Sequence, residues 1–239
     1  MATIIVVFSF FIYNYQDSIK NYIDTLIDKN GMIIPSYALE EIPDYFGEAY
    51  IVLNNNIPEF EEKDYITESF EIYNALDGLG RCTGAYANVS IYTMPDEERG
   101  SIGSVKPTGW HTVKYDIVDG KYLYNRCHLI GYQLTGENAN EKNLITCTRY
   151  MNAVGMLEFE NKVADYVKKT DNHVLYRVTP IYEGDNLLAS GVQMEAYSVE
   201  DNGEGIQFNV FVYNVQEGIK IDYKTILLIN YFLRFHNLF

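Results

Sequence analysis

The stretch YNRCHLIGY, residues 124–132, decides the fold, because an extended apolar pattern in it ends on a chemically active side chain, His128. Tyr122 to Ile130 has the residue types of a strand. His111 to Asp116 has them too, and the intervening Val118-Asp119-Gly120 contains Asp-Gly, a strong hairpin turn signal. We therefore expect His128 near the end of the second strand of a hairpin.

The chain beyond this strand changes its pattern twice. Residues 131–154 hold few periodic apolar residues and many Asn, Thr and Gly, which predicts a long ordered loop, and such loops are often functional. Met156 to Lys169 then places Phe159, Val163 and Val167 on one helical face. The segment from Tyr124 to Glu160 thus has the order strand, polar loop, helix.

The flanking sequence is richer in strands than in helices, and 22 tyrosines favour β structure. Hairpin turns between the strands indicate an α+β fold, with a central antiparallel sheet and flanking helices. Helices are predicted at Asp17 to Asp28 and Glu68 to Leu76, and Pro95 to Gly109 is predicted to be a loop. The expected strands are Tyr86 to Thr93, His173 to Tyr182, Leu187 to Val199 and Ile206 to Val215.

Composition divides the 239 residues into three parts. Residues 1–75 are acidic and irregular and are expected to form an accessory or covering segment, residues 76–223 the main domain, and residues 224–239 an apolar tail of uncertain role. The apolar run Ile4 to Ile12 is shorter than the roughly 20 residues of a membrane span and lacks a preceding Lys or Arg. A shortened export signal and a buried strand both remain open for it.

Net charge and cysteine count restrict the function. A net charge of −15 opposes a general nucleic-acid-coating surface, because phosphate neutralisation supplies most nonspecific affinity. Only weak, salt-sensitive binding at a local site is compatible with it. Cys82, Cys127 and Cys147 form no CxxC pair, so a zinc site is not indicated. Three free buried thiols are the preferred interpretation, and one disulfide with one free thiol is the alternative.

Four polar side chains in the strand–loop–helix segment are those that a one-metal phosphodiesterase requires. His128 precedes Asn152 by 24 positions, and Glu160 follows Asn152 by 8. A neutral histidine can accept a proton from water near neutral pH. An amide oxygen with a nearby carboxylate suits a hydrated Mg²⁺, and Arg126 can grip phosphate oxygens with its planar guanidinium. Taken singly, each of these residues is more often structural, so the prediction depends on their order and spacing.

The segment Asn125-Arg126-Cys127-His128 resembles the Asp-Arg-Gly-His motif of the DNA/RNA non-specific endonuclease family, and within it the branch of streptococcal DNA-entry nucleases and secreted DNases. The similarity covers about residues 75–223, which makes residues 76–223 the expected endonuclease domain. It implies a ββα-metal (His-Me finger) active site. His128 would be the general base, and Arg126 a catalytic and substrate contact. Asn152 would ligate the metal, with Asn143 supporting the site.

The resemblance also assigns Glu160, which would be a catalytic residue that orients metal-bound water. Asn125 replaces the family aspartate and is expected to give weaker electrostatic support, and Cys127 replaces the glycine. From the upstream loop, Arg99 and Lys106 are candidate substrate contacts for flanking phosphates, equally compatible with plain surface positions.

The expected function is Mg²⁺-dependent hydrolysis of DNA, with RNA as a further substrate and Mn²⁺ as a substitute metal. No small-molecule cofactor is expected, and the sequence does not decide membrane association or an inhibitor protein. Two alternatives remain: a catalytically inactive nucleic-acid-binding or toxin-associated module, and a metal-independent structural protein. The resemblance favours a secreted or cell-surface bacterial protein, although the short N-terminal run leaves the cytoplasm open.

Overall fold

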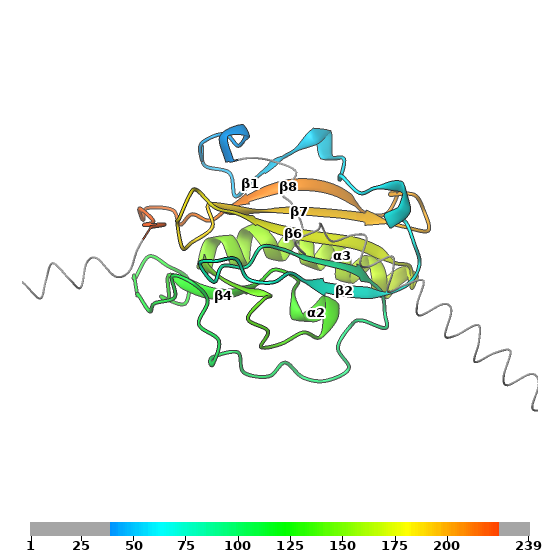
Figure 1. Ribbon diagram of the computed structural model, residues 1–239, viewed down its shortest axis with the longest axis horizontal. Coiled ribbons are helices and arrows are strands. Elements are labelled where there is room, and N and C mark those ends of the chain that lie inside the picture. The colour runs from blue at the N-terminus through cyan, green and yellow to red at the C-terminus, as the bar shows by residue number, and fades with distance from the viewer. Residues whose placement is uncertain (1–38, 225–239) are drawn as a thin grey trace, which may run out of the picture.

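A six-stranded antiparallel sheet forms the centre of the computed structural model, which describes residues 39–224 (Figure 1). Every neighbouring pair of its strands is antiparallel. In spatial order the strands are β1 (Tyr50–Val52), β8 (Gln207–Tyr213), β7 (Gly191–Ser198), β6 (Val174–Ile181), β3 (Ala85–Val89) and β2 (Phe70–Tyr73). The predicted α+β class with a central antiparallel sheet is confirmed.

A second, two-stranded unit precedes the principal helix. β4 (Tyr124–His128) pairs antiparallel with β5 (Leu144–Thr148), and α2 (Tyr132–Thr135) lies in the connection between them. A π-helix (Met151–Met156) follows β5 and runs directly into α3 (Leu157–Thr170). Three-residue 3-10 helices complete the described elements, at Leu39–Glu41, Asn54–Asn56 and Glu62–Asp64.

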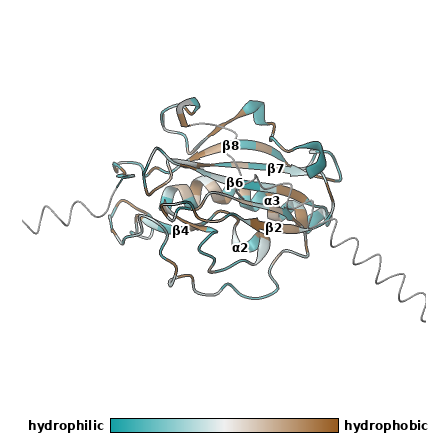
Figure 2. Cartoon of the chain, viewed as in Figure 1, coloured by the Kyte–Doolittle hydropathy of each residue, from teal (hydrophilic) through white to brown (hydrophobic). Residues whose placement is uncertain are grey.

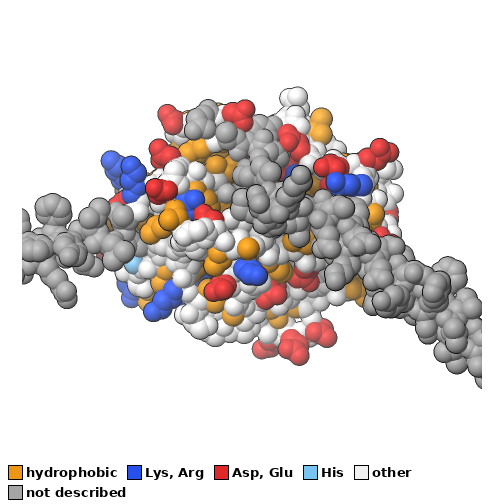
Figure 3. Space-filling model, in the orientation of Figure 1, with side chains coloured by type: hydrophobic (Ala, Val, Ile, Leu, Met, Phe, Trp, Pro, Cys, Tyr) orange, Lys and Arg blue, Asp and Glu red, His pale blue; other side chains and the backbone are white. Residues whose placement is uncertain are grey.

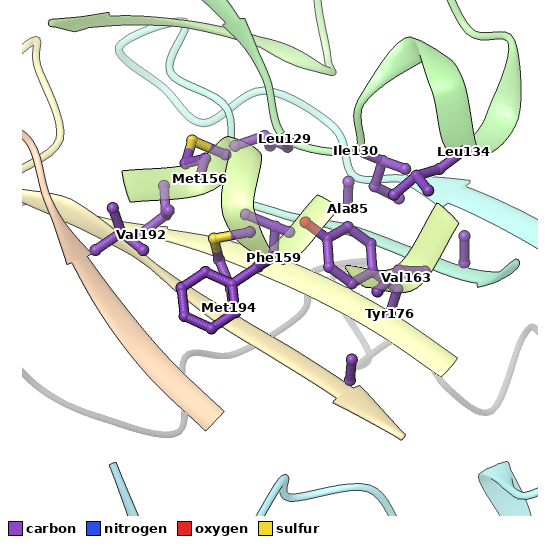
Figure 4. Close-up of a cluster of buried hydrophobic side chains, with 14 of the residues drawn as sticks. Ala85, Leu129, Ile130, Leu134, Met156, Phe159, Val163, Tyr176, Val192 and Met194 are labelled. Carbon is purple, nitrogen blue, oxygen red and sulfur yellow. The ribbon is translucent and has the colours of Figure 1, made fainter. Parts of the chain in front are cut away.

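The core lies between α3 and one face of the sheet. Phe159, Val163 and Val167 of α3 are buried against apolar side chains of β3, β6, β7 and β8 (Figure 4). Leu129 and Ile130, which follow β4, enter the same cluster and tie the hairpin to the sheet. Figure 2 shows the corresponding apolar colouring on α3 and on the strands.

The predicted pairing of the His128 strand is wrong. Residues 111–116 make only one bridge to it, Lys114 to Tyr122, because the turn at Asp119-Gly120 closes a short loop and no ladder extends from it. β4 pairs instead with β5, whose five residues are all buried. Residues 131–154 therefore contain a strand as well as loop. The alternation of apolar and polar residues that indicates a strand does not reveal β5, because β5 is short and all of its residues are buried.

Other sequence predictions have mixed outcomes. The helix predicted at Glu68 to Leu76 is wrong, since Phe70 and Ile72 alternate into the core as part of β2. The loop predicted at Pro95 to Gly109 is confirmed, and so is the helix that corresponds to α3. The four strands predicted outside the 111–130 region are also confirmed, with shifted ends, as β3, β6, β7 and β8. The helix predicted at Asp17 to Asp28 lies outside the described residues, as do the Ile4 to Ile12 run and residues 225–239.

The cysteines do not follow the preferred interpretation. Cys127 and Cys147 form a disulfide across the β4–β5 hairpin, with their Cα atoms 5.9 Å apart, and Cys82 is a buried free thiol. Adjacent antiparallel strands bring two such Cα atoms within the range that a disulfide needs. The alternative of one disulfide plus one free thiol is therefore the observed state.

The domain boundaries at 75/76 and 223/224 stay predictions. β1 and β2, both before residue 76, pair with β8 and β3. The N-terminal part thus contributes edge strands to the sheet in addition to covering segments. Within residues 39–224, no helix has the length and apolar character needed to cross a membrane.

Candidate active site

His128 ends β4 and is held in one tautomer by the backbone. The residue is 7% exposed, and its Nε2–H donates to the carbonyl of Asn138 at 2.7 Å. Because a carbonyl only accepts, the lone pair must lie on Nδ1, which faces the guanidinium Nη2 of Arg99 at 3.3 Å. Burial, with the positive charge of Arg99, lowers the pKa of His128 below its usual 6.5. The imidazole is therefore neutral and able to accept a proton at neutral pH.

Asn152 lies in the first turn of the π-helix, a distortion that often occurs at functional sites. Its Nδ2 donates to Oδ1 of Asn125 at 3.2 Å, so its own carbonyl oxygen remains an acceptor. Asn125 thus orients the amide of Asn152 from β4. The π-helix can pack this closely on the sheet because Gly155 has no side chain: a Cβ there would lie 2.3 Å from Val212.

Glu160 lies in the first turn of α3 and its carboxyl group approaches the chain just after β4. A Cβ on Gly131 would lie 2.7 Å from the Oε2 atom of Glu160, so the glycine leaves the space that this carboxyl group occupies beside the backbone. Burial raises the pKa of Glu160 to about 7, against the opposing effect of Arg99. A carboxylate held in such surroundings gains from a nearby cation.

These side chains meet at one cavity of about 300 Å³. Five of the residues predicted from the sequence line it: Arg99, Arg126, His128, Asn152 and Glu160. Two predicted residues do not, namely Asn143 and Lys106. β4, the segment after it and the start of the helical region supply most of the lining residues of this cavity.

Asn143 is fully buried and acts on the backbone. Its Oδ1 accepts from the N–H of Ile130 at 2.9 Å, and its Nδ2 donates to the carbonyl of Ile130 at 3.0 Å. These two bonds continue the pairing of β4 with β5 beyond His128. Asn143 therefore supports the backbone next to His128 and does not line the cavity. Lys106 lines a separate cavity of about 310 Å³, next to Cys82 and Glu141.

Arg126 mainly holds the upstream loop. Its Nε donates to the carbonyl of Val105 and its Nη2 to that of Gly103, while its guanidinium lies 3.7 Å above the ring of Trp110. Arg126 therefore anchors the same loop that carries Arg99, and it still borders the cavity.

Sequence reasoning missed three contributors. Arg149 lines the cavity, Asn138 supplies the carbonyl that fixes the tautomer of His128, and Gly131 makes room for Glu160. Arg149 directly follows β5, and recognising that strand would have placed its side chain near the hairpin. The other two act through the backbone, and no residue-type pattern signals such a role.

The donor chemistry fits a hydrated hard cation. Asn152 offers an amide oxygen and Glu160 a carboxylate, and both line the cavity. Within the described part of the chain, no cluster of three or more His, Cys, Asp and Glu side chains could enclose a metal ion. A site with so few protein ligands suits Mg²⁺, which keeps several of its waters, better than the closed Cys/His set of structural zinc.

Comparison with known proteins identifies the family of the chain. A model of the DNA/RNA non-specific endonuclease family matches residues 61–200, more than half of the chain, so the chain belongs to that family. Among curated proteins it is similar to a deoxyribonuclease of Streptococcus dysgalactiae subsp. equisimilis, with 29% identity over 202 residues. That match covers 66% of this chain and 60% of the relative, so the chain spans less than two thirds of the relative's length.

Solved structures give the same result. NucA from Streptococcus agalactiae, with a magnesium ion bound, aligns with a TM-score of 0.67 and 25% identity over 78% of this chain and 88% of its own. Sda1 nuclease with a bound zinc ion aligns with a TM-score of 0.58 and 29% identity, over 74% and 94%. The predicted resemblance to streptococcal DNases is confirmed.

Proposed function

We propose that this chain is an endonuclease that hydrolyses phosphodiester bonds of DNA without sequence specificity, with a divalent cation, Mg²⁺, that Asn152 would ligate and Glu160 would hold through water. The observation that supports it most is the single cavity lined by His128, Asn152 and Glu160, with the His128 tautomer set by Asn138. β4, β5 and the helical segment after them would then form a ββα-metal motif.

In this proposal His128 is the general base. Nδ1 accepts a proton from water, whose oxygen attacks phosphorus, and the bond from phosphorus to the 3′ oxygen breaks. The departing 3′ oxygen takes up a proton from solvent water. The products carry 5′-phosphate and 3′-hydroxyl ends. Nη2 of Arg99 now faces Nδ1, so Arg99 must turn toward a phosphate oxygen before water can reach the base. A bound Mg²⁺ would stabilise the charge that develops on phosphorus and on the departing oxygen.

The remaining residues position these groups. Asn125 keeps the Asn152 oxygen available, and Asn143 fixes the backbone just after His128. Arg126 holds the loop that carries Arg99 and adds positive charge at the cavity. Lys106, in its separate cavity, would contact only nucleic acid that extends beyond the reacting phosphate.

Cleavage of RNA and use of Mn²⁺ are part of the same proposal. We also propose that the protein acts outside the bacterial cell or at its surface rather than in the cytoplasm. The similarity to streptococcal DNases and the Cys127–Cys147 disulfide support this, because disulfides persist mainly in oxidising compartments.

A plasmid assay with metal titration tests the proposal. Purified protein should convert supercoiled plasmid to nicked, linear and then fragmented DNA with Mg²⁺, lose this activity with a chelator, and regain it with Mg²⁺ or Mn²⁺. Cleavage that persists in the chelator would reject the metal-dependent function. A folded protein that binds DNA but never cuts it would instead favour the inactive binding module.

A further inference from the structure

Arg149 is an additional arginine at the active-site cavity. It directly follows β5, and its backbone N–H donates to the carbonyl of Leu123 at 2.8 Å, which fixes the start of its side chain. Its Nε and Nη2 both donate to Oδ2 of Asp119, at 3.1 and 2.8 Å. Arg149 therefore lines the cavity while a carboxylate from a turn 30 residues earlier holds its guanidinium.

Positive charge is concentrated at this cavity. Its lining includes the guanidinium groups of Arg99, Arg126 and Arg149 and one carboxyl group, that of Glu160, in a chain whose net charge is −15. Figure 3 shows acidic side chains dispersed over one face of the molecule, where no continuous basic surface appears. The cavity is thus a local exception suited to an anion.

The three arginines differ in what they already bind. Arg126 is engaged by two backbone carbonyls and by Trp110, and Arg99 faces His128. Arg149 is bound by a carboxylate whose side chain is 79% exposed, while its own side chain is 37% exposed. An ion pair this open to water is weak, so another anion can replace the carboxylate at little cost.

We propose that Arg149 binds the phosphate next to the scissile one on the nucleic-acid strand, and that this phosphate displaces Asp119. A phosphate presents two oxygens to the planar guanidinium, as a carboxylate does, and carries its charge on a polyanion held at several points. Asp119 then acts as a competing anion that weakens substrate binding without entering the reaction. This inference rests on the proposed nuclease function.

Binding measured without cleavage separates the two proposals. In a His128→Ala background, the affinity for a fluorescent DNA duplex follows from anisotropy at several salt concentrations. Adding Arg149→Ala should weaken binding about tenfold and reduce the slope of log affinity against log salt by about 0.9, the value for one phosphate contact. Arg149→Lys should fall between the two. Asp119→Asn should strengthen binding several-fold.

Lys121→Ala is the matched control, since it removes a positive charge from the same turn, paired with Asp116, outside the cavity lining. It should leave affinity within about twofold. An unchanged affinity and salt slope in folded Arg149→Ala would overturn the inference, as would weaker binding by Asp119→Asn, because the ion pair would then be structural. Failure of the wild-type plasmid assay, by contrast, rejects the nuclease proposal itself.

Discussion

The six-stranded sheet and the β4–β5 hairpin use buried polar groups in opposite ways. In the sheet, Glu195 is 1% exposed, and its carboxylate accepts from Arg177 at 2.7 Å and from the backbone N–H of Glu59. Both of its oxygens are therefore engaged in structural hydrogen bonds. At the hairpin, His128 is almost as buried, but it lines an open cavity together with Asn152 and Glu160. Buried polar groups thus stabilise the first region and remain available for chemistry in the second.

Removing a charge from the sheet should give the largest change. Glu195→Ala leaves Arg177 buried without its partner and should lower the free energy of unfolding by about 3–5 kcal/mol. Urea unfolding followed by circular dichroism measures the loss, and cleavage per folded molecule should be preserved. Glu200→Ala, which removes a more exposed partner from His173, should cost about 1 kcal/mol or less. Equal losses in the two variants would contradict the distinction.

Removing the hairpin histidine should do the opposite. His128→Ala should lower kcat for plasmid cleavage at least about a hundredfold while the melting temperature changes little. His173→Ala is the matched control, because that histidine pairs with Glu200 beside the sheet and should leave kcat unchanged. Wild-type cleavage by His128→Ala would remove it from the reaction.

Loosening the amide of Asn152 should have a smaller effect. Asn125→Ala deletes the acceptor that orients Asn152 and should lower cleavage about tenfold at low Mg²⁺, with partial recovery at high Mg²⁺. Asn125→Asp keeps an acceptor and should restore activity. A metal titration of initial rates distinguishes these outcomes, and an Ala variant with wild-type metal dependence would refute the orienting role.

The pH dependence should change least. The general base must be neutral and the carboxyl group of Glu160 ionised, so kcat/KM should fall as the pH drops through the pKa of Glu160, about 7, and fall further through the pKa of His128, which lies below 6.5. Arg99→Ala removes a charge that lowers both pKa values, so the acid limb should move to higher pH. Rate profiles from pH 5 to 8 measure the acid limb of the wild type and of Arg99→Ala. An acid limb that moves to lower pH in Arg99→Ala would contradict this effect of Arg99 on the pKa values.

The sequence singled out residues that the structure places at one cavity, but it did not predict the strand pairing around them. The sequence singled out His128, Asn152 and Glu160 because the proposed chemistry needs an imidazole, an amide oxygen and a carboxylate. The family motif supplied their spacing. The same reasoning paired β4 with the wrong segment, because a turn signal is local whereas the choice of partner strand depends on long-range burial. Lys106 was predicted from its charge alone, and charge does not indicate which cavity a loop residue lines.

Apart from Arg149, the site contributors that sequence reasoning missed act through the backbone. Three such features depend on how the chain folds rather than on side-chain type. They are the carbonyl of Asn138, the absence of a side chain at Gly131 and the π-helix that positions Asn152. The disulfide was left open for a similar reason, since pairing Cys127 with Cys147 requires β5 to be recognised first.

A crystal structure grown with Mn²⁺, located by its anomalous scattering, tests the central claim most directly. The ion should lie in the cavity beside the amide oxygen of Asn152, with the carboxylate of Glu160 near its waters and Nδ1 of His128 across the space that a phosphate would fill. Mn²⁺ bound elsewhere, or absent from this cavity at concentrations that support cleavage, would contradict it.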